Sequence, residues 1–355
     1  MTRLSYLALN AIEDYAVFVI AAIASLLIAQ LQAHAVTLEP TMTLPPAMRY
    51  ASVIGLGEAT HASDEVARAK VLLFQRLVED DDVRILAIEG DWSEWTAMDA
   101  YVMGGPGDAA SLVAKQDFSL YRNSELAELI RWIRLYNSSH PDDPVHVVGI
   151  DMQEPEKTKR LAESGGPLAA AASEQLRRAS ARLAHPSLLA RDEDMTANVL
   201  ALVKSHAKVA LWAHDGHVTA FDYTMPSWHP LGTRLRAALG SRYFAVGTVV
   251  GGGTFRARPA PGVPAVVMQF PEHAMPANEL FSRVGHAFFL NFASVAPSSE
   301  LRKWLDKPRD VFMAGGTVIP GAEVTVRLPL TRAFDAVVFL PKVHPTVPLS
   351  VSVSR

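Results

Sequence analysis

The sequence SVIGLGEATH, residues 52–61, joins a short apolar run to a group of polar residues. Ser52–Gly57 carries branched and small residues and passes directly into Glu58 and His61. A continuous apolar run of this length is typical of a strand buried on both faces of a parallel sheet. The same pattern recurs at residues 84–89, 146–150, 209–213, 243–250 and 336–340, with a further strand expected at 288–292.

Amphipathic stretches separate these runs. Asp64–Glu79 and Ser124–Tyr136 place apolar residues at helical spacing, and residues 157–207 contain no strand pattern and are rich in Ala, Leu and Arg. Strands alternating with helices of this length favour βαβ units. We therefore expect an α/β domain over residues 51–345, with a mostly parallel central sheet, helices on both of its faces and a helical insertion at about 157–207.

The first 50 residues differ from the rest of the chain. The apolar run at residues 16–29, followed by Ala33 and Ala35, is typical of the hydrophobic part and cleavage site of a signal peptide. We expect residues 1–35 to be a signal peptide, or alternatively a membrane anchor, and residues 36–50 to be a Pro- and Thr-rich linker. An exported, periplasmic protein is the expectation, with a membrane-anchored or cytoplasmic one as the alternative.

Composition excludes several classes of function. The chain has 355 residues, no cysteine and a net charge of −4, so disulfide scaffolds, thiolate metal sites and cysteine nucleophiles are absent. No basic stripe indicates nucleic-acid binding. A small molecule is the expected partner, and a membrane is one only if the N-terminal segment is retained.

Polar side chains stand where four of the predicted strands end. Ligands of open α/β sheets bind outside the carboxyl ends of the strands, so these side chains are expected to share one edge. Each motif alone also has a structural interpretation, such as a helix start at Glu58–His61, but their convergence favours a ligand or catalytic site. The residues are Glu58 and His61, then Glu89, Asp91 and Trp92, then Asp151 and Gln153, and last His214, Asp215 and His217.

This set of residues favours hydrolysis by an activated water. Histidine titrates near neutral pH, and a neighbouring carboxylate fixes its tautomer and stabilises its protonated form. No Gly-x-Ser-x-Gly nucleophile elbow and no phosphate-binding P-loop occurs. Thr60 replaces the third glycine of a dinucleotide fingerprint, which excludes a nicotinamide site. Water activated by histidine or by a metal remains.

Several ordered motifs resemble the erythromycin esterase family. They are GLGEATH at 55–61 followed by Lys70, IEGDW at 88–92, GIDMQ at 149–153, RDEDMTAN at 191–198, WAHDGHV at 212–218 and FDAVVF at 334–339. The resemblance runs from about residue 51 to 341 and implies an esterase that opens a lactone, such as that of a macrolide antibiotic, without a covalent intermediate or a cofactor.

The resemblance also implies roles for individual residues. His61 would be the general base, Glu58 and Glu89 would orient it and balance its charge, and His214 and His217 would bind or polarise the ester. Lys70 could assist the oxyanion, and Arg191 and Asp192 would organise the site. The residues expected to contact substrate are Lys70, Asp91, Asp151, Arg191, Asp215 and Trp228.

The sequence departs from the family pattern in ways that concern the substrate. Ala62 replaces the usual glycine after the histidine, and Asp215 replaces an asparagine. The 37 residues between Gln153 and Arg191 form a shorter insertion than that of the macrolide esterases. A smaller substrate cleft would follow.

Two other functions stay open at this point. The same His and Glu residues have the ligand chemistry of a zinc or manganese site, so a metal-dependent hydrolase of the TIKI/TraB type is one alternative, by analogy. A non-catalytic protein that binds a small molecule on the same scaffold is the other. Metal analysis with a chelator tests the first, and ligand affinity without turnover would indicate the second.

Overall fold

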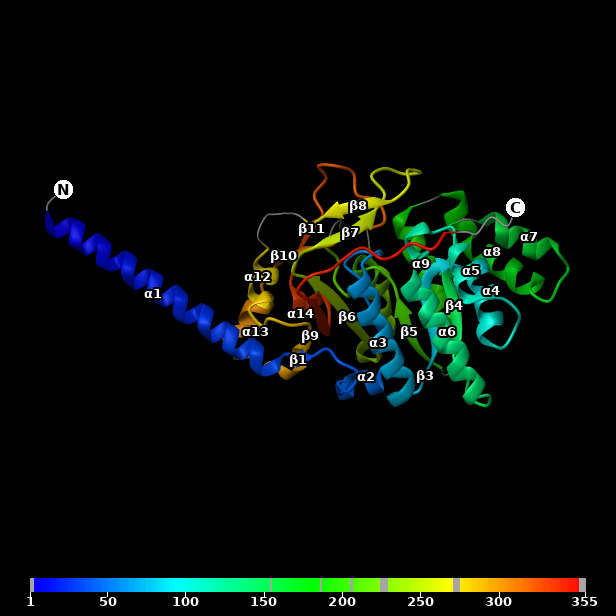
Figure 1. Cartoon of the computed structure of the whole chain (residues 1–355), viewed down its shortest axis with the longest axis horizontal. Coiled ribbons are helices and arrows are strands. Elements are labelled where there is room, and N and C mark those ends of the chain that lie inside the picture. Colours follow the sequence, from blue (N-terminus) through cyan, green and yellow to red (C-terminus); the bar gives the residue numbers. More distant parts are fainter. Residues whose placement is uncertain are drawn as a thin grey trace.

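The computed structural model describes residues 3–153, 155–185, 187–204, 207–223, 229–270 and 275–350. An eight-stranded sheet with the order β1-β9-β12-β6-β2-β5-β3-β4 lies at its centre (Figure 1). Neighbouring strands from β12 to β4 are parallel, whereas β9 is antiparallel to both β12 and β1. The mostly parallel α/β fold predicted from the sequence is therefore confirmed. The strands are β1 (Val36–Thr37), β2 (Val53–Leu56), β3 (Val83–Asp91), β4 (His146–Asp151), β5 (Lys208–Trp212), β6 (Tyr243–Val250), β9 (Phe288–Asn291) and β12 (Ala336–Leu340).

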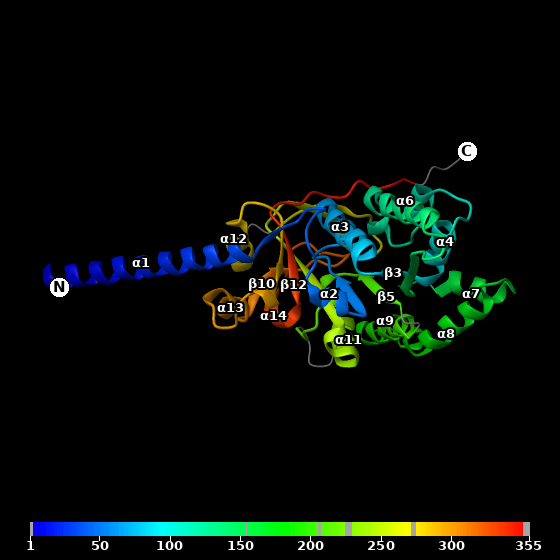
Figure 2. The same ribbon diagram turned by 90° about the horizontal axis from the view of Figure 1, so that it is seen from below.

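The strands are apolar throughout because each face of the sheet has its own core. Successive residues alternate between them: Val53 packs in one core and Ile54 in the other. The core of Ile54 is covered by α3 (Asp64–Asp80), α4 (Trp92–Val102), α5 (Ala109–Ala114) and α6 (Ser124–Ser139). The core of Val53 is covered by α9 (Leu188–Val203), α11 (Leu231–Leu239), α12 (Pro276–Ser282) and α13 (Glu300–Leu305), as Figure 2 shows from below.

Residues 157–207 run through helices and no strand within the described residues. They contain most of α7 (Pro155–Glu163), then α8 (Ala169–Ala184) and α9. Helices α7 and α8 contact each other and lie beyond the edge strand β4 (Figure 1). The insertion therefore reaches the sheet at the end where Asp151 leaves β4.

Two small antiparallel sheets, absent from the sequence-based prediction, lie close to the carboxyl ends of the main strands. One pairs β7 (Thr254–Ala257) with β8 (Val266–Gln269), and the other pairs β10 (Arg309–Phe312) with β11 (Thr325–Leu328). Each of these strands has only four residues, and Pro- and Gly-containing loops join the paired strands, so their sequence pattern is weak. The remaining elements are α2 (Pro46–Tyr50), η1 (Ser119–Tyr121), α10 (Asp215–Val218), η2 (Gly240–Arg242), η3 (Phe292–Ser294) and α14 (Leu330–Ala333).

The N-terminal region forms one long helix, α1 (Arg3–His34), which includes the apolar run at 16–29. Near its C-terminal end Leu27 and Leu31 are buried, and the Gln30 side chain accepts a hydrogen bond from the Leu301 amide. Its earlier turns project away from the rest of the chain (Figure 1, Figure 2). Among the described residues, no helix combines the length and the apolar character that a membrane span requires.

Residues 36–50, predicted to be a linker, pack against the domain. They contain β1 and α2, and Met42 and Met48 are buried in the core beneath α3. Methionine and leucine side chains between the prolines give this segment enough apolar surface to pack against the domain.

Residues 342–349, here called the C-terminal strap, run back across the domain near α3 and α6 (red in Figure 1). The amide of Thr346 donates to the Ala62 carbonyl at 3.2 Å, and the amide of Leu349 donates to the Arg122 carbonyl at 2.8 Å. The strap therefore connects the loop after β2 to the start of α6 through backbone hydrogen bonds.

Replacing Gly149 with alanine should destabilise the fold. A Cβ on Gly149 in β4 would lie 2.7 Å from the carbonyl oxygens of Gly90 and Asp91, which are backbone atoms and cannot move aside cheaply. We expect Gly149→Ala to lower the free energy of unfolding by about 1–3 kcal/mol, measured by urea denaturation. Gly252→Ala is the control, since a Cβ at that residue would have nothing within 4 Å; equal midpoints for the two variants would contradict the prediction.

Candidate active site

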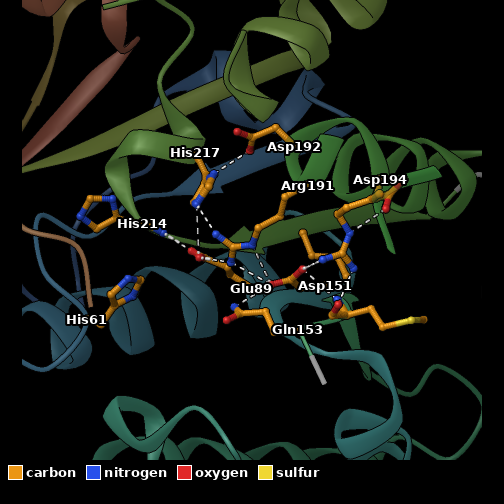
Figure 3. A network of polar contacts seen from close by, with 12 residues as sticks. His61, Glu89, Asp151, Gln153, Arg191, Asp192, Asp194, His214 and His217 are labelled. Carbon is orange, nitrogen blue, oxygen red and sulfur yellow. Dashed lines mark hydrogen bonds and ion pairs between the residues drawn. The ribbon is translucent and has the colours of Figure 1, made fainter. Parts of the chain in front are cut away.

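The sheet order places the predicted site residues beside one another. Strands β2, β5, β3 and β4 are consecutive neighbours, and each is parallel to the next. Residues after β5 therefore lie between those after β2 and those at the end of β3. Figure 3 shows His61, His214, His217, Glu89, Arg191 and Asp151 gathered at this edge.

Glu58 anchors the first half of the cluster. Its Oε1 accepts hydrogen bonds from Nδ1 of His61 at 2.7 Å and from the hydroxyl of Tyr121 at 2.9 Å, and its Oε2 accepts one from Nζ of Lys70 at 2.7 Å. Because the carboxylate is an acceptor, Nδ1 of His61 carries a proton, and in the neutral form of the ring the lone pair is on Nε2. Within the described part of the chain, Nε2 of His61 has no polar partner.

The charges in this half hold Glu58 ionised. Burial alone would raise the pKa of Glu58, but Lys70 and His61 outweigh it and lower the pKa to about 2. Burial lowers the pKa of Lys70 more than Glu58 raises it. The ammonium group of Lys70 also lies 4.1 Å from the centre of the Trp212 ring and 3.5 Å from the Ala213 carbonyl. Lys70 thus supports Glu58 from within the core, a position different from the substrate contact predicted for it.

Aromatic rings set the position of the His61 imidazole. Phe118 and Tyr121 meet it edge to face, with ring centroids 4.9 and 5.7 Å away. Both flank or belong to η1, in a segment with no recognisable motif. Neither was predicted from the sequence; the only signal is that buried Glu58 requires additional donors, and tertiary packing decides which residue supplies them.

His214 lies beside His61 but uses both of its nitrogens internally. Its Nε2 donates to the Ala314 carbonyl at 3.1 Å, and its Nδ1 accepts from the Gly216 amide at 3.1 Å. Burial, followed by the proximity of His61, lowers the pKa of His214 to about 3. The ring is therefore neutral, and its centroid stands 5.0 Å from that of His61.

Glu89 anchors the second half of the cluster (Figure 3). Its Oε2 accepts the His214 backbone amide at 2.9 Å, while its Oε1 lies 2.6 Å from Nη2 of Arg191 and 3.3 Å from Nε2 of His217. Burial raises the pKa of Glu89, yet His217 and Arg191 together hold it well below its usual value.

His217 is held between two carboxylates. Its Nδ1 lies 2.6 Å from Oδ1 of buried Asp192, opposite Glu89. Burial lowers the pKa of His217, but Glu89 and Asp192 outweigh this and raise it to about 10. Nη1 of Arg191 lies 3.0 Å from Nε2 of His217, the ring nitrogen that faces Glu89. His217 and Arg191 therefore both compensate the charge of Glu89.

Arg191 connects the second half to β4. Its Nε and Nη2 donate to Oδ2 of Asp151 at 2.9 and 2.8 Å, and the Gln153 amide donates to the same oxygen at 2.8 Å. Burial of Arg191 would lower its pKa, but Asp151 and Glu89 outweigh this effect and raise the pKa. Burial of Asp151 would raise its pKa, but Arg191 outweighs this effect and lowers it. Helix α9 supplies both Arg191 and Asp192, as the sequence motif predicted for organising residues.

Asp91 and Asp215 occupy structural positions beside the cluster. Asp91 caps α4, where its Oδ1 accepts the Ser93 amide at 3.0 Å. Asp215 accepts the Thr248 amide at 3.1 Å, and burial raises its pKa to about 8. Its side chain fits only because residue 57 is glycine: a Cβ there would lie 1.9 Å from Oδ1. The remaining predicted substrate contact, Trp228, lies outside the described residues.

The carboxylates of the site are paired with cations of the protein. Glu58 contacts Lys70, and Glu89 and Asp151 contact Arg191. Among the residues that the structure describes, no three His, Asp or Glu side chains are arranged to hold a metal ion.

A sequence profile described as erythromycin esterase matches residues 78–185 and 162–343 of this chain. The chain belongs to the erythromycin esterase family. The matched residues run from β3 to β12 and include Glu89, Asp151, Arg191, His214 and His217, whereas Glu58, His61 and Lys70 precede them.

Three solved structures share the fold. A succinoglycan biosynthesis protein is 18% identical over 90% of this chain and 97% of its own, with a TM-score of 0.77. A protein from Bacillus cereus is 21% identical over 91% and 98%, with a TM-score of 0.75. An erythromycin esterase, EreC, solved as a histidine-to-asparagine mutant in its open conformation, is 16% identical over 88% and 98%, with a TM-score of 0.62. At these identities the comparisons establish a shared fold.

Removing Arg191 should destabilise this erythromycin esterase family member strongly. Arg191→Met leaves Glu89 and Asp151 buried without their main cation, and we expect a loss of about 3–5 kcal/mol in the free energy of unfolding. Urea denaturation at pH 7 measures it. Arg177→Met is the control, because the Arg177 side chain is 72% exposed and pairs with Glu174 on the surface of α8; its loss should stay below about 1 kcal/mol. A comparable loss for both variants would refute the argument.

Asp215 should make stability depend on pH. Its folded pKa of about 8 lies above the ordinary value, so the folded state holds this proton more tightly than the unfolded state. This contribution is full below about pH 4 and is lost as the pH rises through 8. Asp215→Asn, which resembles the protonated form, should therefore flatten the fall in melting temperature between pH 5 and 9 and melt several degrees higher at pH 9. Parallel melting curves for the two proteins would show that Asp215 is not protonated in the fold.

Proposed function

We propose that this protein hydrolyses a carboxylic ester or lactone, using water activated by His61 without a covalent intermediate. One observation carries the assignment of the base. Of the three histidines in the cluster, His214 and His217 use both ring nitrogens in contacts with the protein, whereas Nδ1 of His61 is bonded to Glu58 and its Nε2 has no polar partner among the described residues. A neutral imidazole oriented by a carboxylate is the arrangement that general-base catalysis requires.

The proton and electron movements follow from this geometry. Nε2 of His61 takes a proton from water as the water oxygen forms a bond to the ester carbonyl carbon. Glu58 stabilises the resulting imidazolium, and Lys70 and Tyr121 keep Glu58 in place. The bond from the carbonyl carbon to the alcohol oxygen then breaks, and His61 returns the proton to the departing alkoxide. The products are a carboxylic acid and an alcohol, or a hydroxy acid when the substrate is a lactone.

Arg191 and His217 are the proposed stabilisers of the negative charge on the carbonyl oxygen. Both carry positive charge at neutral pH through their contacts with Glu89, and the Arg191 side chain keeps 16% of its surface exposed. Fixed positive groups at a developing oxyanion stabilise the transition state more than the ground state. His214 instead acts as a neutral spacer between His61 and Glu89.

The family points to macrolide lactones as a substrate class to be tested, with antibiotic inactivation and resistance as the biological consequence. The short stretch between Gln153 and Arg191, folded as α7 and α8, favours smaller esters or lactones as well. An exported location, as expected from residues 1–35, would place the enzyme where an incoming antibiotic arrives.

Replacing His61 should remove turnover without unfolding the protein. His61→Asn keeps a polar group of similar size but has no basic nitrogen, so we expect kcat to fall about 10²–10⁴-fold with little change in KM. Erythromycin and a panel of simpler lactones and aryl esters are the substrates, with mass spectrometry following the gain of one water. His185→Asn, at an exposed histidine, is the matched control and should keep full activity.

The same assay separates the alternatives. Hydrolysis that persists after dialysis against EDTA supports a metal-independent reaction, whereas activity that is lost and then restored by Zn²⁺ or Mn²⁺ supports the metal-dependent one. If wild type and His61→Asn bind a lactone equally and neither hydrolyses any substrate, a binding protein is the better description.

A further inference from the structure

We infer that a hollow beneath the C-terminal strap binds a small oxyanion, a carboxylate or a phosphate. This hollow has a volume of about 210 Å³ and lies behind the loop that carries His61. Four polar residues line the hollow. Ser119 is the first residue of η1, Arg122 follows η1, Arg256 is on β7 and Thr346 is on the strap. It is smaller than the sites that hold drug-sized ligands, which start at about 300 Å³.

The two arginines supply positive charge that the protein does not neutralise. Within the described residues, neither Arg122 nor Arg256 forms an ion pair, and no lining residue of the hollow is acidic. Each guanidinium uses one nitrogen to hold a backbone carbonyl: Nε of Arg122 donates to Gln116, and Nη2 of Arg256 donates to Ala265. The other nitrogens keep donors that match the paired oxygens of a carboxylate or phosphate.

Two hydroxyl groups complete the set of donors. In the part of the chain that is described, neither Ser119 nor Thr346 forms a side-chain hydrogen bond, although Thr346 is only 4% exposed. The Thr346 hydroxyl oxygen is not among the fully enclosed polar atoms that lack a partner, so it stays accessible to a ligand. An oxyanion between Thr346 and the two guanidinium groups would accept a hydrogen bond from this hydroxyl.

Two acidic side chains of the neighbouring helix α3 are paired with other residues. On α3, Asp64 accepts from Arg68 at 2.6 Å and Glu65 contacts His344 of the strap at 2.6 Å. Because Asp64 and Glu65 have these partners, neither forms an ion pair with Arg122 or Arg256. The positive charge of the hollow is left for a ligand.

The hollow also touches the loop of the proposed base. Ala62, which follows His61, lines it, and the Ala62 carbonyl accepts the backbone amides of Arg256 at 3.3 Å and Thr346 at 3.2 Å. Ser119 follows Phe118, whose ring contacts His61. Occupancy of the hollow would brace both segments, but the binding site stands on its own residues and does not depend on the proposed reaction.

Isothermal titration and thermal unfolding of the full chain test this inference, with inorganic phosphate and with malonate as probes at ionic strength held constant with NaCl. We expect saturable binding to one site and a rise in melting temperature with ligand. Arg122→Gln combined with Arg256→Gln should weaken binding at least about tenfold, since the charged hydrogen bonds from both guanidinium groups to the oxyanion would be lost. Arg242→Gln, at an exposed arginine in η2, should bind as wild type does.

The tighter probe identifies the ligand class: phosphate indicates a phosphoryl group, and malonate a carboxylate. Should the double variant not fold, Thr346→Val and Ser119→Ala serve instead, each expected to weaken binding several-fold. Absence of saturable binding for both probes would overturn the inference. So would equal affinity in wild type and in the folded variants.

Discussion

The site depends on how two buried carboxylates, Glu58 and Glu89, are compensated. A carboxylate without a partner in a protein interior would be strongly destabilised and would take up a proton. Lys70 forms an ion pair with Glu58, and Arg191 and His217 both form ion pairs with Glu89. Each cation comes from a different helix, α3, α9 or α10, so the charges bind those helices to the ends of the strands.

This compensation gives the three histidines different properties. His214 contacts Glu89 only through its backbone, and burial leaves its ring neutral with a pKa of about 3. His217 lies between Glu89 and Asp192, and its pKa rises to about 10. His61 pairs with Glu58, whose charge Lys70 also shares, and within the described residues it is the one histidine of these three with a ring nitrogen that has no polar partner. Three identical side chains within one cluster therefore differ in charge and in hydrogen bonding, and in the reaction proposed above they would act as spacer, cation and base.

The segments far from the strand ends contribute through packing around His61. Phe118 and Tyr121 hold its ring, and Ala314 accepts from His214 across the cluster. The C-terminal strap bonds to Ala62 from behind. Long-range contacts of this kind explain how residues from about 61 to 346 act on one imidazole, and why the loosely patterned region after residue 250 belongs to the site.

The sequence by itself determined the order of buried strands, the edge where they end, and the identity of the histidines and carboxylates there. It could do so because continuous apolar runs are typical of strands buried on both faces of a sheet, and because ligands of open α/β sheets bind outside the carboxyl ends of the strands. Glu58, His61, Glu89, His214, His217, Arg191 and Asp151 come together as that reasoning expected. Tertiary structure alone decided which ring nitrogens of the three histidines have partners, that Lys70 lies within the core, and that the Tyr121 hydroxyl donates to Glu58. Hydrogen-bond partners and burial depend on distances of a few tenths of an ångström between segments far apart in the chain, and no local pattern of residues encodes such distances.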